Sequence, residues 1–267
     1  MAILGYLIAV LIGLSLGLIG GGGSIITVPV LVYLLKVEPV SATMYSLFVV
    51  GSCSLVGSAK AYKKGLVDTP VVFVFGGASM LSVFIARHYL VPLLPDYLFS
   101  IGDITVTKST FLMLAFAFLM LVTSVSMIRA AVRPPMIPVP GQDQARKMLP
   151  LFAQGAAVGA VTGLLGAGGG FLIIPALVLF GKLPMKTAVG SSLTIMTFSS
   201  LFGFFSTLAQ YTINWALLLS FTAIAVGGIF IGMKLSDKIS PNSLKKGFGW
   251  FVLIVAVLVI IREIFFA

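Results

Sequence analysis

Charge, cysteine and histidine are all scarce in this 267-residue chain. Asp, Glu, Lys and Arg together make up 9% of the residues, whereas 59% are hydrophobic. Because soluble domains carry about 25% charged residues, this composition argues against a water-soluble fold. Cys53 is the only cysteine, so no disulfide can form within the chain, and its apolar surroundings indicate a small core residue. His88 is the only histidine, and the sequence places no partner beside it.

Enzyme signatures are missing as well. The chain has no HExxH motif, no CxxC pair, no Ser-His-Asp arrangement and no lysine after a phosphate-binding glycine loop. Its glycine clusters do not follow a strand within a soluble βαβ unit, so they fit dinucleotide binding poorly. We therefore expect a protein that is not an enzyme and that holds no cofactor and no metal.

Long apolar runs, in contrast, are abundant. The mean hydropathy is +1.17, and several runs reach the ~20 apolar residues that a membrane-spanning helix needs. The net charge of +10 comes from bases at the ends of these runs, which favours membrane topology over nucleic-acid binding. The sequence therefore predicts an all-α, polytopic helical membrane protein whose partner is the lipid bilayer and not a nucleic acid.

Two glycine clusters, GLIGGGGSII from Gly17 and GLLGAGGGFL from Gly163, indicate an internal repeat. A shift of 146 residues aligns them without a gap, and matched glycines, prolines and lysines are less easily produced by chance than matched leucines. The same frame pairs Pro29 with Pro175, Lys36 with Lys182, Ala42 with Ala188, Ser46 with Ser192, and Gly57 with Gly203.

Each half of the repeat offers five apolar segments, and a polar, proline-rich stretch separates the halves. We predict an N-terminal membrane repeat at 1–128, a cytoplasmic linker at 129–148 and a C-terminal membrane repeat at 149–267. The predicted segments are 3–19, 24–35, 42–59, 69–95 and 110–128 in the first half, and 149–165, 171–181, 187–208, 213–233 and 247–265 in the second.

The basic residues predict how the two halves are oriented. With the linker in the cytoplasm, 13 of the 17 Lys and Arg residues fall on the cytoplasmic side, as the positive-inside rule expects. Five segments in each half then invert one half relative to the other, an arrangement typical of transporters. We expect both termini to face outward from the inner (cytoplasmic) membrane, with the N-terminal run retained as the first membrane segment.

Segments 24–35 and 171–181 are too short to span a membrane. At 1.5 Å per residue each covers about 17 Å of a ~30 Å hydrocarbon core. With the helix before it, each is expected to form a hairpin whose turn is the glycine cluster. Pro29 and Pro175 would then lie in the first turn of the returning helix. Ser24 could cap its helix, although its repeat mate is a glycine.

These glycine turns are candidate anion sites. A glycine-flanked helix start presents unpaired backbone N–H groups and a positive dipole end, and two such starts meeting at the midplane could hold one oxyanion. The alternative is that glycine merely permits close helix packing. The candidate ligands are Gly21, Gly22, Gly23, Ser24, Ser46, Gly168, Gly169, Gly170, Phe171, Ser191, Ser192 and Arg87.

Few ionisable residues fall within the apolar segments. Arg87 lies about 27 Å along its segment, near the outer interface, where it either snorkels to a lipid headgroup or contacts substrate. Asp68 and Asn214 align in the repeat at segment starts, where helix capping is the expected role. No carboxylate lies at mid-membrane, so the sequence does not choose between H⁺ and Na⁺ as a coupling ion.

The stretches GLIGGGGSIITVPVLVYLL and GLLGAGGGFLIIPALVLFGKLPMKTAVGSSL, with the duplicated layout, carry a family resemblance. Over essentially its whole length the chain resembles the sulfite exporter TauE/SafE family of membrane transporters. The resemblance implies transport of a small sulfur-containing anion such as sulfite, sulfoacetate or another organosulfonate. We therefore expect a secondary transporter working by alternating access. An anion channel using the same site and a non-transporting membrane scaffold subunit are the alternatives, and an oligomer is compatible with each.

Overall fold

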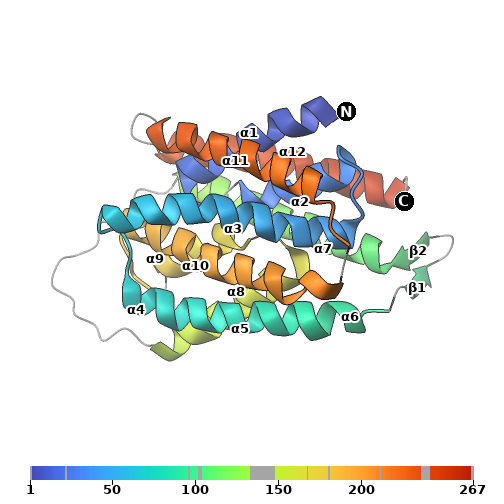
Figure 1. Cartoon of the computed structure of the whole chain (residues 1–267), viewed down its shortest axis with the longest axis horizontal. Helices are drawn as coiled ribbons and strands as arrows, with labels where there is room; N and C mark the ends of the chain where they lie inside the picture. Colours follow the sequence, from blue (N-terminus) through green and yellow to red (C-terminus); the bar gives the residue numbers. More distant parts are fainter. Residues whose placement is uncertain are drawn as a thin grey trace.

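The computed structural model describes residues 2–21, 23–95, 97–101, 104–132, 148–166, 168–179, 181–210, 212–235 and 241–265. Within these residues the fold is a bundle of α-helices with a small antiparallel β-hairpin at one end (Figure 1). Gly22 and most of the predicted linker lie outside the described residues. The predicted all-α membrane architecture is confirmed, because six helices in the described part of the chain are long and apolar enough to cross a membrane.

The helices fall close to the predicted segments. Thr69–Leu93 is one continuous helix in which two π-helical turns separate shorter α-helical stretches. The elements are α1 Ala2–Ile19, α2 Ser24–Tyr33, α3 Pro39–Lys63, α4 Thr69–Val71, η1 Val72–Gly76, α5 Gly77–Ile85, η2 Ala86–Leu90, α6 Val91–Leu93, β1 Tyr97–Ile101, β2 Ile104–Thr107, α7 Lys108–Val132, α8 Met148–Leu165, α9 Gly170–Leu179, α10 Met185–Ser206, η3 Leu208–Gln210, α11 Trp215–Leu235 and α12 Pro241–Phe265.

The glycine clusters interrupt the helices as predicted, but the prolines lie elsewhere than expected. The helices α2 and α9 have 10 residues each; α2 begins at Ser24, directly after the first glycine cluster, and α9 begins at Gly170, the last glycine of the second. Pro29 and Pro175 therefore lie inside these helices and not in their first turn. In each half the glycine cluster forms the turn between the two helices, so the second helix begins where the turn ends. The proline then lies five residues after the start of that helix.

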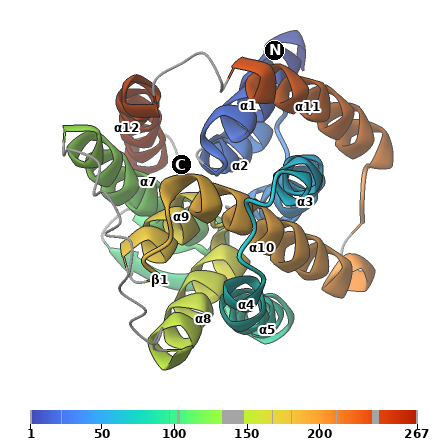
Figure 2. The same cartoon turned by 90° about the vertical axis from the view of Figure 1, so that its left-hand side faces the viewer.

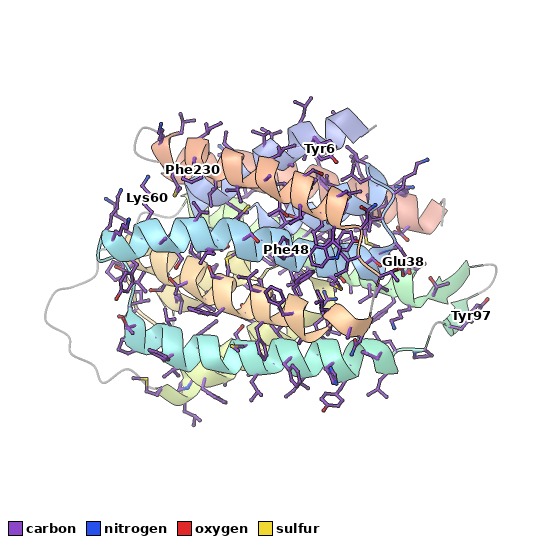
Figure 3. All side chains as sticks on the ribbon, in the orientation of Figure 1. Tyr6, Glu38, Phe48, Lys60, Tyr97 and Phe230 are labelled. Atoms are coloured by element: carbon purple, nitrogen blue, oxygen red, sulfur yellow. The ribbon has the colours of Figure 1, made fainter. Side chains whose placement is uncertain are left out.

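The β-hairpin after α6 was not predicted. Strand β1 pairs antiparallel with β2, with Ile101 opposite Ile104 and a register shift between Tyr97 and Phe99. Tyr97, in this hairpin, lies at one end of the bundle, and Lys60 of α3 lies at the other end (Figure 3). These strands are four and five residues long, too short for their alternation to be distinguished from loop in an apolar sequence.

Helix packing connects the two halves rather than keeping them apart. Helix α1 packs on α11, α8 packs on α5, α3 packs on α10 and α7 packs on α12 (Figure 2). Glycines allow these close approaches, since Gly17 lies against the backbone of Ile229 and Gly163 lies against that of Val83. Each half therefore packs its first helix against the fourth apolar segment of the other half.

Contacts in one half recur in the other at positions 146 residues apart. Gly13 approaches the Ala225 carbonyl oxygen, and its repeat mate Gly159 approaches that of Ser79, the repeat mate of Ala225. A hydrogen bond recurs in the same way: Val37 N–H donates to Leu31 O in the first half, and Leu183 N–H donates to Leu177 O in the second. The backbone is left-handed at the repeat mates Lys36 (φ 56°) and Lys182 (φ 50°). These paired contacts agree with the internal repeat that the sequence predicts.

The repeat mates α3 and α10 lie side by side and run in opposite directions. Gly51 packs on Leu201, whereas Gly57, further along α3, packs on the earlier residue Leu193. The antiparallel course of the two helices is also visible in Figure 1. Phe48 of α3 is half-buried (Figure 3), and its ring centroid lies 4.8 Å from that of Phe204 of α10.

The predicted linker, residues 129–148, lies mostly outside the described residues, and its first four positions belong to helix α7. Helix α7 continues to Val132, and α8 begins at Met148. The residues between them lie outside the described part. The division into an N-terminal and a C-terminal repeat remains a prediction.

Candidate functional site

The two glycine turns meet in the interior of the bundle. A β-carbon built on Gly21 would lie 2.6 Å from the carbonyl carbon of Gly170, and one built on Gly168 would lie 3.3 Å from Ser24 Cβ. We call Gly21, Ser24, Gly168, Gly169 and Gly170 the glycine junction. No side chain larger than hydrogen fits at Gly21 or Gly170 without moving backbone, so glycine is required there for the approach itself.

Each turn begins with a left-handed glycine seated on a helix of the other half. Gly20 (φ 80°) packs on Val189 of α10, and its repeat mate Gly166 (φ 69°) packs on Thr43 of α3. Thr43 and Val189 are themselves repeat mates. A positive φ suits glycine and strains other residues by about 1–2 kcal/mol, which is a conformational reason for the glycine clusters.

The glycine junction brings together the N-terminal ends of α2 and α9. The N–H of Ile26 bonds to Gly23 O, and the N–H groups of Leu172 and Ile173 both bond to Gly169 O. The amides that precede them, at the very start of each helix, have no partner within the helix. Two positive dipole ends therefore lie close together.

Ser24 does not cap α2 in the way expected of an N-cap residue. The N-cap position is Gly23, which has no side chain, and the Ser24 hydroxyl donates instead to Gly21 O at 2.9 Å. This bond ties the first residue of the helix back onto the turn. The Ser24 side chain therefore shapes the glycine junction rather than ending the row of free amides.

Two apolar side chains border the glycine junction, and each is followed one turn later by a buried serine. Val50 of α3 packs on Gly168, and its repeat mate Met196 of α10 packs on Gly170. Ser54 and Ser200 lie four residues further along these helices, on the same faces. Both are fully buried, and neither hydroxyl has a hydrogen-bond partner among the described residues.

Ser54 and Ser200 are repeat mates that the sequence prediction missed. The signal was present, since the 146-residue frame pairs two hydroxyls inside an apolar run. Two further buried hydroxyls without a partner in the described part of the chain lie nearby: Thr162, which contacts Gly169, and Thr27, three residues after Ser24. Because a buried hydroxyl without a partner costs about 1–3 kcal/mol, this cluster points to a bound ligand or water.

The structure separates the two predicted serine ligands, Ser46 and Ser192. Ser192 adjoins Leu193, which is level with Gly57 of α3, and Ser46 lies 11 residues before Gly57. At 1.5 Å per residue, about 16 Å separates the two serines along the bundle. The antiparallel course of α3 and α10 is the cause, because it places repeat mates on opposite sides of the centre.

The hydroxyls of Ser46 and Ser192 also differ in their partners. Ser192 donates to Val189 O at 2.8 Å and lies 3.4 Å from Gly20 O. Ser46 is fully buried, and its hydroxyl has no hydrogen-bond partner among the described residues. Ser192 thus lies beside the start of the first glycine turn, and Ser46 lies one helical turn after Thr43, on which Gly166 packs. Of the two, only Ser46 has a hydroxyl without a partner among the described residues.

A pair of repeat-related hydrogen bonds links each half to a loop of the other. The N–H of Asp68 donates to Ser191 Oγ at 2.9 Å, and the N–H of its repeat mate Asn214 donates to Tyr45 Oη at 2.7 Å. Ser191 is the repeat mate of Tyr45. The predicted capping roles are confirmed, since Asp68 Oδ1 accepts from Val71 N–H and Asn214 Oδ1 accepts from Leu217 N–H.

Arg87 does not snorkel to a surface as the sequence suggested. Its side chain is 1% exposed and lies in the π-helical turn η2. The preceding residue, Ala86, contacts Gly163 on α8 shortly before the second glycine turn. The Arg87 guanidinium is therefore buried within the bundle, while the neighbouring His88 stacks on Phe84 and its Nδ1 lies 3.3 Å from Gln210 Nε2.

Comparison with known proteins agrees with this architecture. The model of the Sulfite exporter TauE/SafE family matches residues 5–259. A probable membrane transporter protein of Xylella fastidiosa (strain 9a5c) is 30% identical, with 95% of this chain and 92% of the relative covered. The probable membrane transporter protein YunE of Bacillus subtilis is 29% identical, with 95% of each chain covered. No solved structure matches. The chain therefore belongs to the sulfite exporter TauE/SafE family and is a multi-pass membrane transporter.

Proposed function

We propose that this transporter moves a small sulfur-containing anion, such as sulfite, sulfoacetate or another organosulfonate, across the cytoplasmic membrane by alternating access. The anion would be held at the glycine junction. The observation that carries the proposal is the meeting of two helix N-termini among buried hydroxyls that have no partner within the described residues. Helix N-termini favour anions, and hydroxyls donate hydrogen bonds to oxyanions without requiring a counter-charge.

The proposed ligands come from both halves. The backbone amides of Gly21, Gly22, Gly23 and Ser24 would bind from one turn, and those of Gly168, Gly169, Gly170 and Phe171 from the other. The hydroxyls of Ser54 and Ser200 would complete the central site, since they lie one turn from the residues that border it. Gly22 takes its place in this proposal from the sequence alone.

Ser46 and Ser192 would serve the two approaches to the centre and not the centre itself. Their separation of about 16 Å fits two points along one pathway better than two ligands of one small anion. Ser191 would act beside Ser192 through its bond to the Asp68 amide. Arg87 would raise the local concentration of anions on its side of the pathway, because a buried cation acts strongly where water is excluded.

Alternating access requires two similar gates that open in turn. The inverted-repeat prediction supports this mechanism, because the repeat mates α3 and α10 run antiparallel and the loop contacts at Asp68 and Asn214 are equivalent. With the basic residues of the linker in the cytoplasm, both termini would face outward. In this proposal H⁺ or Na⁺ is the coupling ion, and the mechanism is compatible with an oligomer.

A binding screen followed by transport tests this proposal. Purified protein would be heated with sulfite, thiosulfate, sulfoacetate, taurine or sulfate, with phosphate and acetate as controls. A ligand present at about 100 times its Kd stabilises the folded state by about 2.7 kcal/mol, which a melting curve resolves. We expect at least one sulfur anion, and neither control, to raise the melting temperature and to be transported into proteoliposomes.

The alternatives give different results in the same experiments. An anion channel would show unitary conductance in planar bilayers and flux far above transporter rates. A scaffold subunit would show neither a ligand-dependent melting temperature nor uptake. Uptake that is unaffected by changes at the glycine junction would contradict the proposed binding site.

A further inference from the structure

An apolar groove of about 790 Å³ runs between α2 and α12 and is not part of the glycine junction. One stripe of α2 forms its floor, with Ile26, Pro29, Val30 and Tyr33 at helical spacing. Ser24 and Thr27, which turn toward the glycine junction, are not among its lining residues. The two faces of this short helix therefore border different environments.

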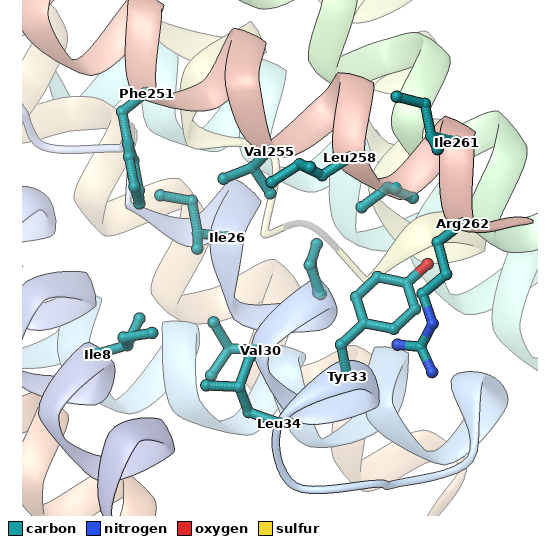
Figure 4. Close-up of a pocket in the computed structure, with 12 residues that line it drawn as sticks. Ile8, Ile26, Val30, Tyr33, Leu34, Phe251, Val255, Leu258, Ile261 and Arg262 are labelled. Atoms are coloured by element: carbon teal, nitrogen blue, oxygen red, sulfur yellow. The ribbon is translucent and has the colours of Figure 1, made fainter. Parts of the chain in front are cut away.

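The groove is apolar along its length and polar at one end. Phe251 lies toward one end, and Tyr33 and Arg262 lie together at the other (Figure 4). The Arg262 guanidinium carbon lies 4.1 Å from the centroid of the Tyr33 ring, within cation–π range. The Tyr33 hydroxyl donates to Glu263 Oε1 at 2.8 Å. The adjacent carboxylate is thus held by a tyrosine, and the exposed guanidinium stays available for an anion.

The length of the groove matches one leaflet of a bilayer. From Phe251 to Arg262 there are 11 residues, or about 16 Å of helix, and half of a ~30 Å hydrocarbon core is ~15 Å. Arg262 lies three residues before the end of α12 at Phe265, a helix long enough at 25 residues to cross the core. The guanidinium would therefore be level with lipid phosphates when the groove is level with their acyl chains.

We infer that this groove binds an anionic phospholipid, with one acyl chain along α2 and α12 and the phosphate on Arg262. The half-length helix α2 leaves space that a full-length helix would fill, and no side chain among the described residues fills it. Charge selects the lipid, because the polar end of the groove offers the Arg262 guanidinium, and the neighbouring Glu263 carboxylate already accepts a hydrogen bond from Tyr33. This site is independent of the transported anion.

Native mass spectrometry of the purified protein tests the inference. The protein would be equilibrated with equal amounts of phosphatidylglycerol and phosphatidylcholine that carry the same acyl chains. We expect the wild type to retain phosphatidylglycerol several-fold over phosphatidylcholine. Arg262→Gln should abolish this preference, and Glu263→Gln should increase it, because the amide keeps an acceptor for Tyr33 but removes the negative charge. Arg262 is exposed, so its replacement should leave the fold intact.

Two further samples separate the acyl chain from the headgroup. Val255→Phe should lower retention of both lipids by filling the groove, and Arg129→Gln, at an exposed arginine on α7, should change nothing. Equal retention of the two lipids by the wild type, or an unchanged preference in Arg262→Gln, would overturn the inference. So would displacement of the lipid by glycerol phosphate, which has no acyl chain, or occupation of the site by a second copy of the protein.

Discussion

Gly21 and Gly170 belong to different halves of the chain, yet a β-carbon added to either would lie 2.6 Å from the backbone of the other. This contact joins the two interrupted helices at the point where their free amides begin. Backbones approach so closely in membrane proteins chiefly through small residues. Here the approach brings together two helix ends that carry partial positive charge, so the same glycines determine both the packing and the electrostatics of the site.

Gly169→Val should abolish transport while the protein still inserts into the membrane. Gly169 has a φ of 71°, and a β-carbon there would collide with Thr162 Oγ1. A left-handed valine is strained by about 1–3 kcal/mol, and the turn would move to relieve the strain. Uptake in proteoliposomes measures the loss. Gly227→Ala is the control, because nothing lies within 4 Å of its β-carbon position, and wild-type uptake by Gly169→Val would contradict the proposed site.

Ser200→Ala should weaken substrate binding without lowering stability. Its hydroxyl has no partner among the described residues, so removing it costs the empty protein little. Loss of a hydrogen bond to an anion costs about 1.5–3 kcal/mol, so KM should rise roughly 10- to 100-fold. The adjacent Ser199→Ala is the matched control, since the Ser199 hydroxyl bonds to Ile195 O at 2.9 Å within its own helix. Equal KM values for the two variants would count against a ligand at Ser200.

Tyr45→Phe and Ser191→Ala should open the pathway on opposite sides. Tyr45→Phe removes the acceptor of the Asn214 amide, and Ser191→Ala removes the acceptor of the Asp68 amide. Losing about 1 kcal/mol of stabilisation shifts the equilibrium between the closed and open states of that loop contact about fivefold. Cys53, the only cysteine and fully buried, is a native reporter of access. Membrane-impermeant thiol reagents would be applied to vesicles of both orientations.

With the orientation proposed above, Tyr45→Phe should speed labelling from outside and Ser191→Ala from inside. Cys53→Ser removes the reporter and is the blank, and serine suits this position because the repeat mate of Cys53 is Ser199. Faster labelling from both sides in both variants would indicate general loosening of the helices and not two separate gates.

Arg87→Met should destabilise the protein, whereas Arg87→Lys should separate stability from anion binding. Arg87 is 1% exposed, and changes at buried residues commonly cost about 0.5–3 kcal/mol, so Arg87→Met should lower the melting temperature. Lysine keeps the charge but not the planar fork of donors. If Arg87 attracts the anion, Arg87→Lys should fold and retain part of the uptake. Wild-type kinetics in a stable Arg87→Lys would restrict Arg87 to a structural role.

Much of the fold could be predicted because local rules and the repeat agree. Apolar length placed the spanning helices, glycine placed the interruptions, and alignment of Asp68 with Asn214 predicted two caps that the structure contains. The candidate site was only partly predictable. Spacing placed Ser46 and Ser192 in equivalent positions, but it could not reveal the level at which α3 and α10 pack against each other, which puts the two serines about 16 Å apart.

Other features depend on tertiary contacts that no local pattern reports. Arg87 lies in η2 and is buried, whereas position along the segment alone suggested the interface. Ser54 and Ser200 looked like ordinary helix serines, since most such hydroxyls bond to their own backbone. Only the absence of that bond within the described residues distinguishes them.

The exchange of first helices between the halves limits how the molecule can move. The backbone of α1 packs directly on that of α11, and the backbone of α8 packs directly on that of α5, through glycines with no room for a side chain. Under the proposed alternating access, the units that tilt against each other would be pairs of helices drawn from both halves of the chain, with α3 and α10 between them. A single half synthesised alone would expose the glycine face of its first helix and, under the predicted inversion, would need a second, oppositely inserted copy to cover it.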